Sequence, residues 1–459
     1  MNNLEEIRSI FHNKKILIWG FGKEGKSTYK LIKEICPDQE VDFLDQDTEM
    51  LSVFFSEEKI NTTRIIDKNI SQEELELYDM IVKSPGVNVS KYNFQNLNIR
   101  SQADIFIQIF RNQIIGITGS KGKSTVASLT YHLLNKCNIH CLLGGNIGIP
   151  PFDLIKDITE KSLIVLELSA HQLEFCKHSP RISILLNLFE EHLDHFGSFE
   201  NYAQAKMNIM NWQSPGDLFF CNQEIDYFPY TNKEIFPLGH CIKSSLEQND
   251  KASLFMQGAR LLLKFGPIEY KLCGFLDYVT LPGKHNLFNS MIATAASLVC
   301  GADPLNIRKG FYSYETLDHR LQFAGIFGGM KCYNDSISTI PQSTIEALNT
   351  LEKTDILLLG GYDRGIDYSC LTERLKKESP RVIICMREAG KRIYDEIKNH
   401  TSATVLFTSS LAEAMNRINE LKKKEDVCLL SPAAASYGEF KNFEERGKEF
   451  IKILRELQD

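Results

Sequence analysis

Two glycine-rich turns in this sequence have the spacing that phosphate binding requires. The first is Gly20-Phe21-Gly22-Lys23-Glu24-Gly25, a GxGxxG segment between an apolar run and an amphipathic run, and Asp45 ends the next apolar run. Glycines let the backbone approach a pyrophosphate at a helix N-terminus, and an acidic side chain can accept a hydrogen bond from a ribose hydroxyl. The pattern is typical of dinucleotide sites, but it also suits another nucleotide diphosphate or a tight structural turn.

The second turn is Thr118-Gly119-Ser120-Lys121-Gly122-Lys123-Ser124-Thr125, which follows the apolar run 114–117. It ends like a P-loop, in which backbone N–H groups surround phosphate oxygens. The strict pattern has a glycine where this chain has Ile117, so the loop is a variant. We expect Lys123 to contact the β- and γ-phosphates of a nucleotide and Ser124 to ligate Mg²⁺.

A carboxylate and an imidazole follow two further strand candidates. Glu167 lies at the end of one apolar run, and His192 follows another that ends near Asn187. The carboxyl ends of parallel strands form the edge at which α/β sheets bind ligands, so both residues could hold a metal there. A lone histidine is more often structural, and this alternative stays open. Polar clusters at 334–336 and 360–365 are either binding loops or ordinary turns.

The elements that must position these residues alternate between strand-like apolar runs and helix-like amphipathic runs, which predicts α/β layers around parallel sheets. The pattern restarts three times within 459 residues, a length typical of about three domains. We expect a Rossmann-like domain over 1–110, a P-loop ATPase-like α/β domain with a parallel sheet over 111–315, and a second Rossmann-like domain over 316–459. Between 216 and 280 the pattern indicates an antiparallel insertion with a turn at 265–267.

Composition excludes several classes of protein. With 43% hydrophobic and 24% charged residues, the chain is typical of a globular protein and not of a disordered or collagen-like one. A net charge of −7 gives no electrostatic reason to expect a nucleic-acid partner. No apolar run approaches the ~20 residues that span a bilayer, and 1–15 lack the apolar core of a signal peptide. We therefore expect a cytoplasmic protein that binds neither nucleic acid nor membrane, with its 12 cysteines reduced.

Ordered segments along the whole chain resemble the Mur ligase family, the ATP-dependent amide-bond-forming enzymes of peptidoglycan synthesis. The segments that carry this resemblance are 118–125 (TGSKGKST), 145–148 (GNIG), 166–174 (LELSAHQLE), 187–194 (NLFEEHLD), 281–286 (LPGKHN) and 318–320 (DHR). Three more are similar to the members that add glutamate to UDP-N-acetylmuramoyl-L-alanine: 83–86 (KSPG), 360–365 (GGYDRG) and 431–443, which starts SPAAAS and ends FKNF. The DNPR motif usual in the diaminopimelate-adding members does not occur.

The resemblance implies a role for each set of residues. In the first domain, the UDP of the substrate would be bound by Gly20, Phe21, Gly22, Lys23, Glu24, Gly25, Asp45, Ser84, Pro85 and Gly86. ATP would be bound by Gly119, Ser120, Lys121, Gly122, Lys123, Ser124, Thr125, Asn286, His319, Arg320 and Asp335. The other substrate contacts would be Asn146, Ser169 and Gln172 toward the muramoyl group, with Thr339, Arg364, Ser436 and Phe443 in the C-terminal, glutamate-binding domain. The metal ligands would be Ser124, Glu167, His192 and Lys206 as a carbamate.

The implied reaction is the formation of a carbon–nitrogen bond, with ATP and Mg²⁺ as cofactors. ATP converts the alanyl carboxylate into an acyl phosphate, and Mg²⁺, Lys123 and Arg320 offset the negative charge of that transfer. The glutamate amine then attacks, and a tetrahedral intermediate collapses to the amide, ADP and phosphate. Lys123, His192, Lys206 and Arg320 are the implied catalytic residues; without the resemblance, Lys206 would be interpreted as a solvated helix lysine. We expect a monomer whose domains close over its small-molecule substrates, with a part in cell wall synthesis, cell shape and division.

One departure from the family pattern bears on the amino acid that is added. Many members that add D-glutamate carry a lysine in an NDSKAT segment, whereas 334–339 reads NDSIST and places Ile337 there. The cation expected near the incoming amino acid is therefore missing. Arg364 can supply part of this positive charge, because a guanidinium binds a carboxylate bidentately. This segment and 18–25 are also similar to a side branch that adds L-glutamate and relies on a separate epimerase. We favour D-glutamate, with L-glutamate as the alternative; a nucleotide-dependent oxidoreductase or another P-loop NTPase is a more distant one.

Overall fold

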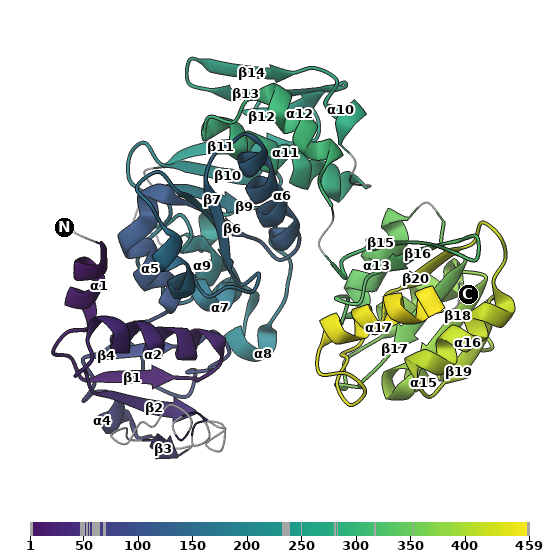
Figure 1. The fold of residues 1–459 in the computed structure, drawn as a ribbon, viewed down its shortest axis with the longest axis horizontal. Helices are drawn as coiled ribbons and strands as arrows, with labels where there is room; N and C mark the ends of the chain where they lie inside the picture. Colours follow the sequence, from purple (N-terminus) through teal and green to yellow (C-terminus); the bar gives the residue numbers. More distant parts are fainter. Residues whose placement is uncertain are drawn as a thin grey trace. The chain divides into compact units, whose positions relative to one another are not determined.

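The computed structural model describes residues 3–45, 51, 54, 56, 65–67, 70–231, 239–248, 250–279, 281, 283–315, 318–351 and 353–456. The chain divides into two compact units (Figure 1). The first consists of Met1–Thr280 with His285–Tyr314, and the second of Leu281–Lys284 with Glu315–Asp459. No helix in the described part of the chain is long and apolar enough to cross a membrane.

The first sheet is parallel and carries the first glycine turn. Its strand order is β3-β2-β1-β4-β5, with bounds β1 Ile16–Trp19, β2 Val41–Asp45, β3 Ile65–Asp67, β4 Met80–Lys83 and β5 Ile99–Arg100. The helices of this part are α1 (Asn3–Phe11), α2 (Lys23–Ile35), α4 (Gln72–Leu75) and α5 (Gln102–Phe110). The order reverses beside β1, so the turn that follows β1 lies at the switch point where doubly wound sheets bind ligands.

The second sheet carries the P-loop-like turn. Its order is β14-β13-β12-β11-β10-β9-β6-β8-β7. The strands are β6 (Ile114–Thr118), β7 (Cys141–Gly145), β8 (Leu163–Glu167), β9 (Ile182–Leu185), β10 (Leu218–Asn222), β11 (His240–Ser245), β12 (Leu254–Gln257), β13 (Arg260–Phe265) and β14 (Ile268–Leu272). Its helices are η1 (Arg111–Gln113), α6 (Lys123–Lys136), η2 (Pro151–Asp157), α7 (Ala170–Leu173), α8 (Leu193–Phe196), α9 (Phe199–Met207), η3 (Phe228–Tyr230), α10 (Phe275–Tyr278), α11 (Lys284–Val299) and α12 (Pro304–Tyr312).

The antiparallel insertion expected over 216–280 is wrong in part. Strands β10 and β11 extend the central sheet in parallel register from β9, and β12 joins β11 in parallel as well. Within this stretch, the antiparallel pairs are β12 with β13 and β13 with β14, and the turn between β13 and β14 falls at 265–267 as expected. A short apolar run such as Leu218–Asn222 is buried in either arrangement, so the sequence pattern alone does not give the direction of its neighbour.

The third sheet lies in the second unit. Its order is β15-β16-β20-β17-β18-β19, with bounds β15 Gln322–Phe327, β16 Met330–Asn334, β17 Ile356–Gly360, β18 Val382–Met386, β19 Thr404–Thr408 and β20 Val427–Leu430. Its helices are α13 (Pro341–Thr350), α14 (Ser369–Lys377), α15 (Arg387–Ile397), α16 (Leu411–Leu421) and α17 (Phe443–Glu456). Ile356 and Leu358 belong to one hydrophobic cluster, whereas Leu357 and Leu359 belong to another. Alternate residues of β17 therefore face opposite layers, as in a sheet buried on both faces.

The predicted α/β class with mostly parallel sheets is confirmed. Within the first unit, one hydrophobic cluster contains residues of both sheets, among them Phe43 of β2 and Leu166 of β8. Ser27 of α2 also donates a hydrogen bond of 2.6 Å to Asp153 of η2. Packing is thus continuous across residue 110, and the boundaries at 110/111 and 315/316 stay predictions.

Candidate functional site

The first glycine turn is a tightly closed loop. Gly20 has φ +92°, and a Cβ on Gly25 would lie 2.2 Å from the carbonyl oxygen of Gly20, so both positions require glycine. Ser84, which follows β4, donates a hydrogen bond of 2.6 Å to the same carbonyl. One carboxylate oxygen of Asp45 accepts from the N–H of Phe21 at 2.5 Å and thereby holds the turn. By contrast, a Cβ on Gly22 would meet nothing within 4 Å, so this side of the turn is open to a ligand.

The second turn joins β6 to α6. Gly122 has φ +84°, and a Cβ there would lie 2.8 Å from the side-chain oxygen of Asn289. The amine of Lys123 donates to the carbonyls of Gly119 and Ser120 at 2.8 and 2.9 Å. The N–H of Lys121 donates to Asn187 at 2.7 Å, which ties the loop to the end of β9. Ser124 and Thr125 lie in the first turn of α6, and Asn286 in the first turn of α11.

Glu167 and His192 lie at the carboxyl edge of the central sheet. Glu167 ends β8 and is buried; its Oε1 accepts from Asn146 at 2.8 Å, while its Oε2 is buried without a hydrogen-bond partner among the described residues. His192 follows β9 with φ +56° and begins α8. Strand β6 pairs with both β8 and β9, so these residues flank the P-loop-like turn. An oxygen buried without a partner is costly, and it marks a position that a cation can occupy.

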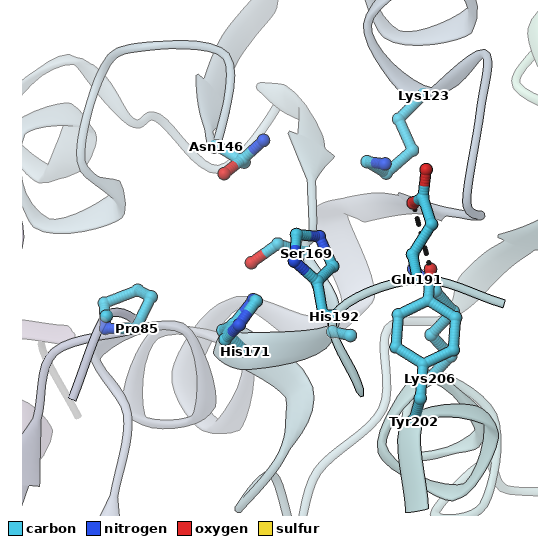
Figure 2. A pocket seen from close by; sticks show the side chains of 11 residues that line it. Pro85, Lys123, Asn146, Ser169, His171, Glu191, His192, Tyr202 and Lys206 are labelled. Carbon is cyan, nitrogen blue, oxygen red and sulfur yellow. Dashed lines mark hydrogen bonds between the residues drawn. The ribbon is translucent and has the colours of Figure 1, made fainter. Parts of the chain in front are cut away.

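A cavity of about 300 Å³ lies at this edge, entirely within the first unit (Figure 2). It is lined by Pro85, Gly86, Lys123, Asn146, Ser169, Ala170, His171, Glu191, His192, Tyr202 and Lys206. Seven of these are residues that the sequence singled out, and they come from loops and helices far apart in the chain. Gln172 joins them through Ser169, because the two side chains form a reciprocal capping box at the start of α7.

Lys206 is buried in this cavity wall. Its side chain, in a residue 1% exposed, donates to the carbonyl of Gly119 at 2.8 Å, and its amine lies 4.8 Å from the ring centre of Tyr202. Burial, followed by the nearby charge of Lys123, lowers the pKa of Lys206 well below its usual range. Interpretation as a solvated helix lysine is therefore wrong, and the amine loses its proton more readily than an exposed lysine.

Three histidines meet at one side of the cavity. The ring of His171 lies 4.8 Å from that of His192 and 4.4 Å from that of His195. Burial and then these two neighbours lower the pKa of His171 to about 3, so its imidazole is neutral at pH 7. Next to them, Glu174 pairs with the buried Lys83 at 3.0 Å and with His195 at 3.2 Å.

In the second unit, the predicted nucleotide residues His319 and Asp335 lie close together. Asp335 accepts from the N–H of Leu321 at 3.0 Å and from the hydroxyl of Ser431 at 2.8 Å, and burial raises its pKa to about 6. His319 lies 2.8 Å from the amide of Asn334, and its ring is 6.3 Å from that of Phe443. Arg320 follows His319 directly, so the segment 318–320 and the ends of β16 and β20 form one cluster.

The other predicted residues of this unit lie around the loop after β17. Arg364 donates to the carbonyl of Thr339 at 2.7 Å, which brings the 360–365 loop to the NDSIST segment. The N–H of Tyr362 donates to the carbonyl of Ala435 at 2.9 Å, directly before Ser436. Thr339, Arg364 and Ser436 therefore surround one loop. Among the segments that carry the family resemblance, Pro282 and the side chain of Asp194 lie outside the described residues.

Comparison with known proteins identifies the family. Residues 117–297 match the Mur ligase middle domain. The chain is 31% identical over 398 residues to the UDP-N-acetylmuramoylalanine--D-glutamate ligase of Acetivibrio thermocellus, covering 84% of each chain. It is 30% identical over 462 residues to the enzyme of the same name from Lactobacillus helveticus, covering 98% of each. The chain belongs to the Mur ligase family. The fold is also similar to the crystal structure of MurF ligase from Thermotoga maritima in complex with ADP, with a TM-score of 0.56, 18% identity, and 96% and 95% of the two chains covered.

Sequence reasoning missed several residues of this Mur ligase's cavity. Glu191 and Tyr202 line it, and Lys121 pairs with Glu191 at 2.6 Å. His171 was part of a recognised segment but was given no role. Lys83 likewise belongs to the segment 83–86 that carries the resemblance, without an assigned role; its charge at the end of the apolar run 80–82 is the signal that marks it.

Proposed function

We propose that this Mur ligase joins glutamate to the alanyl carboxylate of UDP-N-acetylmuramoyl-L-alanine with hydrolysis of ATP. The observation that carries the proposal is the shared cavity: Lys123 of the phosphate loop, Lys206 and His192 line the same space as Pro85 and Gly86. A phosphate-binding loop therefore opens toward the loop beside the first glycine turn. Both relatives compared above are named for this activity, with D-glutamate as the added amino acid.

The open side of the first glycine turn supports binding of the UDP diphosphate at Gly20 to Gly25, because Gly22 leaves room at the N-terminus of α2. We assign Asp45, with Ser84 to Gly86, to the same end of the substrate. Asn146, Ser169 and Gln172 would then meet the muramoyl group. For ATP, we assign 119–125 and Asn286 in the first unit, with His319, Arg320 and Asp335 in the second.

The residues present fit a magnesium ion. The carboxylate oxygen of Glu167 that is buried without a hydrogen-bond partner among the described residues is a hard ligand of the kind Mg²⁺ prefers. Ser124 offers a hydroxyl, and His192 lies at the same edge of the sheet. No group of three or more histidine, cysteine or acidic side chains among the described residues is arranged as a complete metal site. We infer that Glu167, Ser124 and His192 would share the ion with ATP phosphates, where it would neutralise charge during phosphoryl transfer.

Lys206 supports a second proposal about the same site, that its side chain is carbamylated. The neutral amine attacks CO₂, an N–C bond forms as one C–O π bond breaks, and one proton leaves the nitrogen, so the neutral amine becomes an anionic carbamate. Counted from the ammonium form, two protons are lost and a cation is replaced by an anion. The lowered pKa of Lys206 favours the reactive neutral amine, and burial protects the product from water. The carbamate would help to position a second Mg²⁺.

In the proposed reaction, the alanyl carboxylate attacks the γ-phosphorus of ATP, the bond to the bridging oxygen breaks, and ADP leaves as the acyl phosphate forms. Lys123 and Arg320 stabilise the charge on the phosphoryl oxygens. The glutamate amine then attacks the acyl carbon, loses a proton, and displaces inorganic phosphate. Thr339, Arg364, Ser436 and Phe443 are the proposed contacts of glutamate, and closure of the domains over the substrates would exclude the water that hydrolyses an acyl phosphate.

The test is phosphate release by the purified protein with ATP, Mg²⁺ and UDP-N-acetylmuramoyl-L-alanine. D-glutamate and L-glutamate are added in separate reactions, and Lys123→Ala is the inactive control. We expect release with D-glutamate; release with L-glutamate alone would assign the chain to the side branch indicated by Ile337. ATP hydrolysis that needs no amino acid would instead support a different NTPase, and NAD(P)-dependent stabilisation would support an oxidoreductase. We also propose that the protein is cytoplasmic and acts as a monomer. Light scattering during gel filtration tests the monomeric state, and fractionation of cells tests the location.

A further inference from the structure

Glu24 belongs to the first glycine turn, and the proposed reaction gives its carboxylate, one oxygen of which is buried, no role of its own. It lies in the first turn of α2, directly before Gly25. Its Oε1 accepts a hydrogen bond of 2.6 Å from the side-chain amide of Gln172, whereas its Oε2 is buried without a hydrogen-bond partner among the described residues. Isolated burial of an acid is unfavourable, so a carboxylate in this place needs a reason beyond packing.

The orientation of Gln172 follows from its partners. The backbone N–H of Ser169 can only donate, and it donates to Oε1 of Gln172 at 2.9 Å. The amide nitrogen of Gln172 must therefore point the other way, toward Glu24, which accepts. An acceptor at position 24 and a donor at the backbone of Ser169 thus hold the amide in one of its two orientations.

The same contacts determine what Ser169 presents to the cavity. Its hydroxyl donates to Oε1 of Gln172 at 3.1 Å and accepts from the N–H of Gln172 at 3.2 Å. A hydroxyl has one proton and two lone pairs, so these two contacts leave one lone pair that can accept a hydrogen bond from a ligand. Ser169 lines the cavity beside Asn146 and His171 (Figure 2). The chain Glu24–Gln172–Ser169 therefore makes Ser169 a hydrogen-bond acceptor for an N–H or O–H of the substrate.

We propose that Glu24 is a positioning residue: through Gln172 it fixes Ser169 as an acceptor for the UDP-linked substrate, and its own charge tunes the affinity for that anion. This inference rests on the proposed function for the identity of the substrate. The positioning of Ser169 and the effect of charge on affinity can be tested separately. An uncharged side chain with an acceptor oxygen at position 24 preserves the positioning and removes the charge.

The charges around Glu24 come from several elements. Lys83 of β4 and Glu174, at the end of α7, form the ion pair described above, and Cys176 follows them in the chain. Gln102 of α5 donates to the backbone carbonyl of Glu24 at 3.2 Å, and Lys23 is the neighbour on its own helix. Burial raises the pKa of Glu24 to about 7, although the hydrogen bond from Gln172 and the charge of Lys83 act in the opposite direction.

The pH dependence follows from this pKa. The substrate's diphosphate diester is ionised throughout the neutral range, and its carboxyl ionises near pH 3.5, so neither changes charge near pH 7. As the pH rises through 7, Glu24 ionises and repels the bound anion. We expect the KM for the UDP-linked substrate to rise by a factor on the order of 10 between pH 6 and pH 8.5, with the KM for ATP unchanged.

The experiment compares Glu24→Gln, Glu24→Leu and a matched control. Glu34→Gln is on the same helix in an exposed ion pair with Lys156, where the two side chains are 52% and 72% exposed. In Glu24→Gln the amide oxygen still accepts from Gln172, so we expect a low KM at every pH. In Glu24→Leu the acceptor is lost, and we expect a high KM at every pH with kcat within about twofold of wild type. Glu34→Gln should reproduce the wild-type pH profile.

Two further measurements keep the outcomes distinct. Thermal unfolding identifies a variant that fails to fold, in which case Glu24→Gln alone decides through its pH profile. Infrared titration of the wild type minus Glu24→Gln should show a protonated carboxyl band that disappears near pH 7, whatever the enzyme catalyses. If the enzyme turns over and the KM for the UDP-linked substrate has the same pH dependence in wild type and Glu24→Gln, the inference about Glu24 is overturned. No binding of UDP-N-acetylmuramoyl-L-alanine by a folded wild type overturns the proposed function instead.

Discussion

The two glycines at either side of the first turn allow its structural and binding roles to be separated by Gly25→Ala and Gly22→Ala. A Cβ on residue 25 would lie 2.2 Å from the backbone oxygen of Gly20, and backbone cannot move aside as a flexible side chain does. A Cβ on residue 22 would meet nothing within 4 Å. The first substitution must therefore distort the turn, whereas the second places a methyl group only in the space assigned to the diphosphate.

The cost of Gly25→Ala follows from what must move. Relieving the overlap displaces the carbonyl of Gly20 from the hydroxyl of Ser84, a hydrogen bond worth about 1 kcal/mol. Overpacking against the backbone adds roughly 1–3 kcal/mol. We expect a loss of about 2–4 kcal/mol in the free energy of unfolding. Gly22→Ala lies at the N-cap of α2 and should cost no more than about 1 kcal/mol, yet it should weaken binding of the UDP-linked substrate at least tenfold.

Urea unfolding, monitored by tryptophan fluorescence, measures the loss of stability expected for Gly25→Ala, with a reporter close to the turn. The chain has two tryptophans, and Trp19 ends β1 directly before Gly20. Replacing Trp212 by Phe in all proteins leaves Trp19 as the single reporter. Titration calorimetry with UDP-N-acetylmuramoyl-L-alanine measures the weaker substrate binding expected for Gly22→Ala. Equal stability of Gly25→Ala and wild type would refute the steric argument, and unchanged binding by Gly22→Ala would refute placement of the diphosphate at this turn.

Three further predictions concern the other clusters. Lys206→Met should lower kcat at least about 100-fold, and if the lysine is carbamylated, removal of dissolved CO₂ should lower wild-type activity reversibly without a further effect on the variant. Because Asp335 has a pKa of about 6 when folded and near 4 when unfolded, its protonated form favours folding, so its contribution to stability should decrease as the pH rises from 4 to 6. Chemical unfolding should show that Asp335→Asn removes this slope relative to wild type, and an unchanged slope would contradict the pKa assignment. Arg364→Ala should raise the KM for glutamate about 10- to 100-fold and leave the KM for ATP unchanged in steady-state assays, since it removes a charge-assisted contact to a carboxylate.

The parts of the fold that the sequence predicts well are those with local causes. The strand over 382–386 is found at those residues because five apolar side chains in a row are buried on both faces of a parallel sheet. The glycine turns are equally local, since the backbone of Gly20 and Gly122 requires a positive φ that other residues rarely adopt. The direction of β10 and β11 was not predictable in this way, because it depends on a partner strand and not on the run itself.

In the candidate site too, local features could be predicted from the sequence, whereas features that depend on distant contacts could not. The motifs that contain Lys123, Glu167 and His192 could be recognised from residue types and strand ends. The burial of Lys206 could not, because its amine meets the carbonyl of Gly119, which is 87 residues away in the chain. The sequence of its helix also does not indicate burial of Lys206, since polar residues such as Asn201 and Gln204 lie in the same helix. Recognition of the family gave Lys206 a role, but only packing shows that its ordinary ammonium form is disfavoured.

Lysines in and near the cavity resolve an apparent conflict between net charge and function. A protein of net charge −7 must bind an anionic substrate through local charge alone. Lys123 lines the cavity, and Lys83 is buried in an ion pair with Glu174, where burial lowers its pKa. Burying an ammonium group costs several kcal/mol, and one ion pair such as Lys83–Glu174 seldom returns that cost in full. Side chains that destabilise the fold in this way are expected where a charged ligand completes the site, so ligand binding should stabilise the first unit most where these lysines lie.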